Sequence, residues 1–111
     1  MKITIATDFS DVPIGRARKD GDATGEAFRE DWLRPYLEKA SEDAPLIVDL
    51  NGAEGYPSSF LEEAFGGLVR KGYFTAQKLK KILVIEAANG HILYRDIIWE
   101  YITNAGADST E

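Results

Sequence analysis

The chain has 111 residues, of which 44% are hydrophobic, so it is large enough for one domain with its own core and too short for two. It has no cysteine and one histidine, which excludes disulfides, thiol catalysis, zinc–thiolate sites and metal sites built from several histidines. The net charge of −6 disfavours binding to nucleic acid or to an anionic membrane. No apolar run could span a bilayer and no signal peptide is evident, so we expect a cytoplasmic protein.

The first third of the chain predicts a strand, a loop region and a long helix. Lys2–Ala6 alternates and is rich in β-branched residues, which indicates a strand. Ile14–Lys19 fits either a short second strand or a loop. From residue 25 to residue 41 apolar residues recur about every four positions, which predicts an amphipathic helix with Thr24 as its N-cap. Pro35 lies inside this helix and predicts a kink.

The middle of the chain predicts a buried strand, a loop and a second helix. Leu46–Leu50 is a short apolar run, which is typical of a strand covered on both faces. Ser59 and Glu62 have the spacing of a capping box, which predicts the helix N-terminus there. We expect this helix to end near Gly72, and Gly66-Gly67 in its middle to permit the close approach of another backbone.

The last third predicts a short basic helix over Thr75–Lys81, a buried strand over Ile82–Ala87 and a final helix over residues 91–105. Strands alternating with helices predict a small α/β fold, with a mixed sheet of three to four strands packed against three to four helices. The two apolar strands should be parallel neighbours. We expect a single domain over residues 1–105 and a flexible tail over residues 106–111.

The segment Val48–Gly72, VDLNGAEGYPSSFLEEAFGGLVRKG, resembles STAS domains of bacterial anti-sigma-factor antagonists. Its closer resemblance is to the STAS-like domain family of unknown function, whose members carry a Ser-Phe-x-x-Glu entry to this helix, here Ser59–Glu63. The matching positions are Asp49, Gly52, Ser58, Ser59 and Leu61. Pro57 and Phe60 depart from the pattern, since they stand where phosphorylated STAS proteins carry an acid and a glycine.

The resemblance implies a STAS-like fold and a non-enzymatic regulatory role, in a bacterial or phage protein, exerted through protein–protein contact. It implies a partner that is an ATP-binding kinase and also an anti-sigma factor. In such proteins a serine at this helix start is phosphorylated, which makes Ser58 and Ser59 the candidates here. Their other interpretation is plain helix capping. We expect the partner to bind the rim formed by Asn51, Tyr56, Glu62 and Glu63. No cofactor is implied, and the oligomeric state stays open.

A competing hypothesis is a small-ligand binder or an enzyme. Arg16, Arg18 and Arg29 precede or open the first helix and could hold a phosphate or nucleotide together with Glu62. Their simpler interpretation is a solvated loop whose arginines pair with local acids. Glu62 and Glu63 with Asp49 could also hold Mg²⁺, but helix capping and the helix dipole explain both glutamates, so we predict no metal site. The basic cluster from Arg70 to Lys81 is a third candidate, for nucleic acid.

Overall fold

A computed structural model describes residues 1–109 and confirms the predicted α/β fold. Its one sheet contains β1 (Lys2–Thr4), β2 (Leu46–Asp49) and β3 (Leu83–Glu86), with β2 in the centre. The predicted parallel pairing of the two apolar strands is confirmed, with Val48 opposite Ile85. The pair β1 and β2 is parallel as well, so over the described residues the sheet is parallel rather than mixed.

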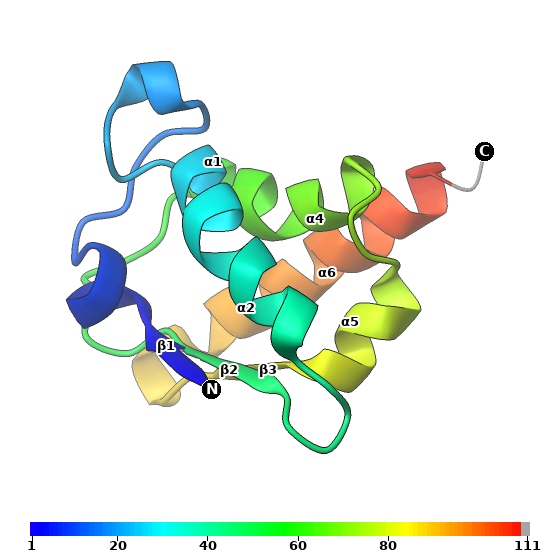
Figure 1. Cartoon of the computed structure of the whole chain (residues 1–111). Coiled ribbons are helices and arrows are strands. Elements are labelled where there is room, and N and C mark those ends of the chain that lie inside the picture. The colour runs from blue at the N-terminus through cyan, green and yellow to red at the C-terminus, as the bar shows by residue number, and fades with distance from the viewer. Residues whose placement is uncertain (110–111) are drawn as a thin grey trace.

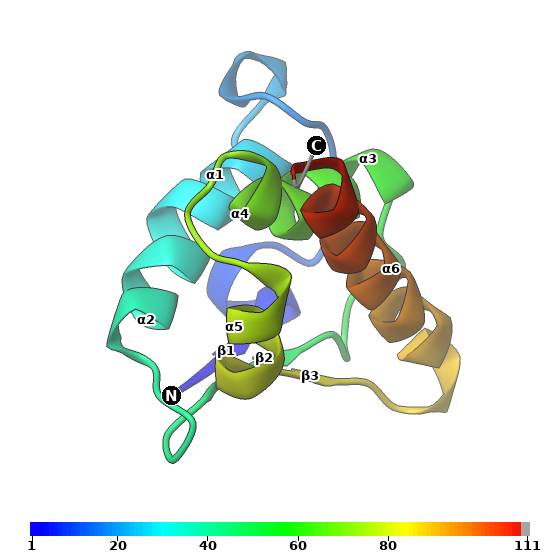
Figure 2. The same ribbon diagram turned by 90° about the vertical axis from the view of Figure 1, so that its right-hand side faces the viewer.

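The helices pack on one face of this sheet (Figure 1). Their bounds are α1 (Gly25–Phe28), α2 (Arg34–Lys39), α3 (Ser58–Leu61), α4 (Gly67–Arg70), α5 (Ala76–Ile82) and α6 (Ile92–Ser109). A π-helical turn, Arg29–Leu33, joins α1 to α2, and a second one, Glu62–Gly66, joins α3 to α4. We therefore describe two continuous helices, the α1–α2 helix and the α3–α4 helix. Figure 2 shows α6 passing beside α4.

On the face of the sheet away from the helices, Ile47 and Asp49 of the central strand are only half-buried, so the prediction of a strand covered on both faces is wrong. In β3, Leu83 and Ile85 are buried beneath the helices, whereas Val84 between them is exposed. On the same outer face the ammonium of Lys2 lies 3.7 Å from the carboxylate of Asp49. The short apolar run in the sequence does not distinguish a strand buried on two faces from one buried on a single face.

The segment before the first helix differs from its prediction in one respect. β1 ends at Thr4 rather than at residue 6, because the chain turns into a π-helical turn, Ile5–Phe9. The carboxylate of Asp8 in that turn accepts a hydrogen bond from the backbone N–H of Thr4 at 2.8 Å. Of the two alternatives for Ile14–Lys19, the structure has the loop, with a 3₁₀ turn over Arg18–Asp20.

Two helix ends agree with the sequence and one extends further. Thr24 caps the α1–α2 helix, since its hydroxyl accepts a hydrogen bond from the N–H of Ala27 at 3.2 Å. Gly72, with φ of +79°, follows the end of the α3–α4 helix, as predicted. Helix α6 continues past residue 105 to Ser109, and residues 110–111 of the expected tail lie outside the described part of the chain.

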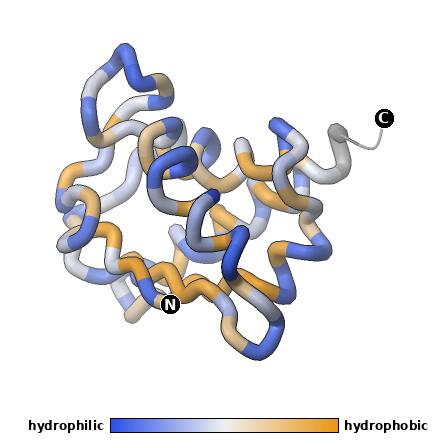
Figure 3. Tube along the Cα trace, in the orientation of Figure 1, coloured by the Kyte–Doolittle hydropathy of each residue, from blue (hydrophilic) through white to orange (hydrophobic). Residues whose placement is uncertain are grey.

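The core lies between the sheet and the helices. Figure 3 shows hydrophobic residues along the strands and hydrophilic ones in the connecting loops. Phe28 of α1 and Phe60 of α3 are fully buried, with ring centroids 5.9 Å apart, and Phe9 packs against both. This aromatic cluster joins the N-terminal π-helical turn to the first turns of both helices, so it fixes the region where the predicted site residues gather.

Candidate functional site

The α3–α4 helix begins at Ser58, which is exposed at its first position. The residue before it, Pro57, has an extended backbone and no side-chain cap, so the predicted capping box of Ser59 and Glu62 is wrong. Ser59 lies within the first turn instead and is half-buried. Within residues 1–109 neither serine side chain makes a hydrogen bond, and of the two only Ser58 is exposed.

The loop between β2 and α3 is held from inside. The hydroxyl of Tyr56 donates a hydrogen bond to the carbonyl of Leu50 at 2.7 Å, and its side chain is buried. Burial raises the pKa of Tyr56. The side-chain oxygen of Asn51 accepts a hydrogen bond from the N–H of Ala88 at 2.8 Å. Two of the residues predicted at the rim therefore hold the loop in place, and Ser58 is presented on a fixed scaffold.

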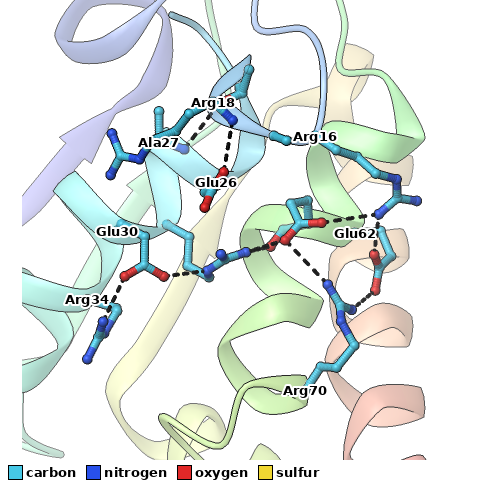
Figure 4. A network of polar contacts seen from close by, with 12 residues as sticks. Arg16, Arg18, Glu26, Ala27, Glu30, Arg34, Glu62 and Arg70 are labelled. Atoms are coloured by element: carbon cyan, nitrogen blue, oxygen red, sulfur yellow. Dashed lines mark hydrogen bonds and ion pairs between the residues drawn. The ribbon is translucent and has the colours of Figure 1, made fainter. Parts of the chain in front are cut away.

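A chain of ion pairs crosses the seam between the two long helices (Figure 4). Arg29, only 1% exposed, donates to the carboxylate of Glu63 at 2.5 Å, to the carbonyl of Glu63 at 2.6 Å and to Glu30 at 2.8 Å. Glu30 also accepts from Arg34 at 2.7 Å, and the guanidinium of Arg34 lies 3.6 Å from the centre of the Tyr73 ring. The buried charge of Arg29 is thus compensated on both sides of the seam.

The exposed end of this chain reaches the loop before α1. Arg16 donates to Glu62 at 2.6 Å and its guanidinium lies 3.5 Å from the carboxylate of Glu63. Arg70 forms a second ion pair with Glu62 and lies 3.5 Å from Glu63. The structure therefore brings together four predicted residues, Arg16, Arg29, Glu62 and Glu63, and it adds Arg70.

Arg18 is not part of this cluster. It makes two hydrogen bonds, of 2.8 and 3.0 Å, to the carboxylate of Asp31 on the exposed side of the α1–α2 helix. The prediction that it joins Arg16, Arg29 and Glu62 in one cluster is therefore wrong. The alternation of cations and acids in this stretch gave no indication of which acid each arginine would choose.

The carboxylates of the seam are held in their ionised form. Burial on its own raises the pKa of Glu30, but hydrogen bonds from Arg29 and Arg34 outweigh it and lower that pKa to about 2. For Glu63, burial likewise raises the pKa, and the hydrogen bond from Arg29 reverses the shift, so the net direction is down. Because each of these acids has arginine partners, the seam is a charge-neutralised contact.

Glycines at the seam let the two helices approach. A Cβ on Gly25 would lie 2.7 Å from the carbonyl oxygen of Phe60, and one on Gly67 would lie 2.5 Å from the guanidinium of Arg29. The prediction that Gly66-Gly67 permits the close approach of another backbone is therefore wrong, because both glycines face side chains. Gly67 makes room for a buried side chain, and backbone meets backbone at Gly25.

The described residues offer neither a metal site nor a membrane-spanning helix. Within residues 1–109, no group of three or more His, Asp or Glu side chains is placed to hold a metal ion. No helix among the same residues combines the length and the apolar character that crossing a membrane requires. The basic cluster from Arg70 to Lys81 is exposed at its four lysines, which form no ion pair within the described part of the chain.

Parallel strands with helices packed on one face, and a helix start that follows the central strand, define the class of the protein as a small α/β domain. Its sequence matches the model of a family described as a STAS-like domain of unknown function, over residues 24–93. The chain therefore belongs to the family of STAS-like domains of unknown function. The same comparisons gave no match to a curated protein and none to a solved structure.

Proposed function

We propose that the protein is a non-enzymatic regulatory domain that binds a protein partner at the start of the α3–α4 helix, and that phosphorylation there switches this binding. The observation that carries the proposal is the position of Ser58. It is exposed, it opens a helix that runs to Arg70, and no side chain caps that helix. A serine that caps its own helix would have to give up a hydrogen bond on modification, and this one would not.

The electrostatics of the helix start favour a phosphate at this place. The first N–H groups of a helix point outward and its positive dipole end stabilises an anion. Glu62 and Glu63, one turn further on, would repel a phosphate if their charges were free. Both carboxylates are instead paired with Arg16 and Arg70, and Glu63 also with Arg29, so their repulsion is reduced.

The partner that we propose is an ATP-binding kinase of the anti-sigma type, as the resemblance to anti-sigma-factor antagonists implies. Such a partner would both phosphorylate Ser58 or Ser59 and bind the unmodified domain, in the cytoplasm of a bacterium or of a phage-infected cell. Ser58 is the preferred acceptor because Ser59 is half-buried beside it.

The test is incubation with the purified candidate kinase, encoded next to this chain where one is present, and with ATP. Intact mass should rise by about 80 Da, one phosphate, and Ser58→Ala should abolish the increase. Ser41→Ala, in the exposed turn before β2, is the matched control and should leave it unchanged. Ser58→Asp should weaken the complex between the domain and the kinase. An unmodified mass together with unchanged binding by Ser58→Asp would remove the proposal.

A second candidate function rests on the cluster of Arg16, Arg29, Arg70 and Glu62. The structure brings these residues together, and Arg16 is about half exposed. A phosphate or nucleotide could displace Glu62 from Arg16 and Arg70. Thermal unfolding with inorganic phosphate and with ATP tests this hypothesis, because a ligand that binds the native state raises its stability. A stabilisation that Arg16→Ala removes, and that Arg18→Ala does not, would favour a ligand site over the protein interface.

A further inference from the structure

Two large aliphatic side chains are exposed on one short loop. Val12 is 61% exposed and Ile14 is 60% exposed, while Pro13 between them is buried. The buried proline anchors the loop, and the two aliphatic groups flank it. A single exposed aliphatic side chain is ordinary on a protein surface, but a pair on one anchored loop is a small apolar protrusion.

The backbone that carries this pair is fixed by hydrogen bonds to the start of α1. The N–H of Ile14 donates to the carbonyl of Ala23 at 2.9 Å, and the N–H of Gly25 donates to the carbonyl of Gly15 at 2.9 Å. The N–H of Val12 donates to the hydroxyl of Ser10 at 3.0 Å. A loop already held in one conformation loses little entropy when a partner binds it.

This loop lies beside the helix start at which we propose that the partner binds. The residue at one end of the loop, Phe9, packs on Phe60 with ring centroids 6.2 Å apart. The residue at the other end, Arg16, is paired with Glu62. Figure 2 shows the segment before α1 passing next to α3. A partner that covers Ser58 would therefore meet this loop as well.

The charges around the loop are predominantly negative. Four exposed aspartates form no ion pair within residues 1–109: Asp8, Asp11, Asp20 and Asp22. The arginines nearby are neutralised, since Arg16 is paired with Glu62 and Arg18 with Asp31. Among the charged residues of this stretch only Lys19 offsets the acids. An apolar protrusion within an acidic surface is complementary to an apolar pocket rimmed by Lys and Arg.

We infer that Val12 and Ile14 insert into an apolar pocket, rimmed by cationic side chains, on the surface of the partner protein. This inference rests on the proposed function, because it concerns the same partner, and it adds a second contact next to Ser58. The phosphorylation site would then control the complex, and the loop would supply affinity and select the partner.

The experiment uses the full chain with a photo-cross-linking amino acid at position 14, expressed in the cells from which the protein comes. A second protein labelled at position 93 is the control, since Leu93 is 74% exposed on α6. Position 14 should give a covalent adduct with one protein, and position 93 should not. The partner identified by mass spectrometry is then purified and titrated with the domain by calorimetry.

Val12→Ser and Ile14→Ser should each weaken binding roughly tenfold or more, because each removes a fully buried aliphatic side chain from the interface. Leu93→Ser should leave the affinity unchanged. Asp11→Asn and Asp22→Asn should slow association, and added salt should do the same. Since all these positions are exposed, the variants should keep the unfolding temperature of the parent.

Three results would overturn the inference. One is an adduct between two copies of this chain, another is no adduct at position 14, and the third is unchanged affinity in the Val12→Ser, Ile14→Ser double variant. A partner that responds to Ser58→Asp and not to the double variant leaves the proposed function in place and removes this inference. A partner that responds to the double variant and not to modification of Ser58 supports the loop contact and removes the switch.

Discussion

The two long helices begin side by side, and their starts are built in opposite ways. At the α1–α2 start, Thr24 is fully buried and caps the helix, and Gly25 packs against the backbone of the neighbouring helix. At the α3–α4 start, Pro57 provides no cap and Ser58 is exposed. The first start is closed and the second is open, although both lie against the same aromatic cluster of Phe28 and Phe60.

Under the proposed function, this difference separates a helix start that serves stability from one that serves recognition. The closed start satisfies its backbone groups internally and forms the seam with Arg29, so changes there should act on stability. The open start leaves its first N–H groups and its first side chain to the outside, so changes there should act on binding. The seam protects this arrangement because it neutralises the glutamates next to Ser58.

The largest effect is expected from Arg29, which lies where the two helices meet. Arg29→Met leaves Glu30 and Glu63 facing each other without their common partner. We expect a loss of about 3 kcal/mol in the free energy of unfolding, at the lower end for a broken buried pair because both glutamates keep some contact with water. Urea unfolding measures it. Arg18→Met is the control, since its pair with Asp31 is exposed to solvent and should contribute little to the stability.

Gly25→Ala should have the next largest effect. The added Cβ would lie 2.7 Å from the carbonyl oxygen of Phe60 and 2.8 Å from the Cβ of Glu63, so the two helices must move apart. Overpacking of this kind costs roughly 1–3 kcal/mol. Gly90→Ala is the matched control, because a Cβ there meets nothing within 4 Å. Equal stability of the two variants would show that the two helices can move apart at Gly25 without loss of stability, which would contradict the prediction.

The elements of the fold could be predicted because they depend on local patterns. Thr24 before an amphipathic run and Gly72 after one mark helix ends by the chemistry of their own backbone. The pairing of Glu62 with Arg70 within the α3–α4 helix could not be predicted, because it depends on the π-helical turn Glu62–Gly66. In an unbroken α-helix the residue seven positions after Glu62 would lie on the same face of the helix. The π-helical turn adds one residue, so that Arg70, eight positions on, takes this place and pairs with Glu62.

The candidate site was partly predictable for the same reason. The start of a helix after the central strand follows from the order of elements, whereas Ser58 and Ser59 were singled out by the resemblance to STAS domains. The exposure of Val12 and Ile14 could not be predicted, since an aliphatic side chain in a loop can be either buried or exposed. The capping box failed because the helix begins one residue earlier, at Ser58, which places Ser59 inside the first turn, and Glu62 pairs with Arg16 and Arg70.

Acid should weaken the ion pairs of the seam and so lower the free energy of unfolding. The pKa of Glu30 is about 2 in the folded protein, against an ordinary value of 4.5, so the unfolded chain binds the proton more readily between these values. The stability that Glu30 contributes is complete above about pH 4.5 and is lost as the pH falls towards 2. We expect roughly 1–2 kcal/mol, less than the full shift implies, because solvent screens part of the interaction.

Glu30→Gln should remove this part of the pH dependence. Urea unfolding from about pH 2.5 to about pH 6 measures it, because the ordinary pKa of a glutamate carboxyl group lies within this interval. Glu42→Gln, in the exposed turn before β2, is the control and should keep the slope of the parent. An identical slope in Glu30→Gln would mean that other carboxylates carry the acid sensitivity of the fold.

The smallest effect tests the two helix starts directly, because it compares a side chain that caps its helix with one that does not. Thr24→Ala removes a cap and should cost about 1 kcal/mol. Ser58→Ala removes no hydrogen bond and should stay within about 0.5 kcal/mol of the parent. Ser58→Asp places a negative charge at the positive end of the helix dipole and should add about 0.3–1 kcal/mol.

These three variants connect stability to the proposed switch. Ser58→Asp can stabilise the domain and still weaken the complex with its partner. The loss of binding then arises at the interface, because the higher stability of the variant excludes unfolding as its cause. If Ser58→Ala instead costs as much as Thr24→Ala, the hydroxyl of Ser58 supports the helix in solution, and the distinction between a closed and an open start fails. Urea unfolding at pH 7 and low salt, where a charge at a helix end counts most, decides between the two.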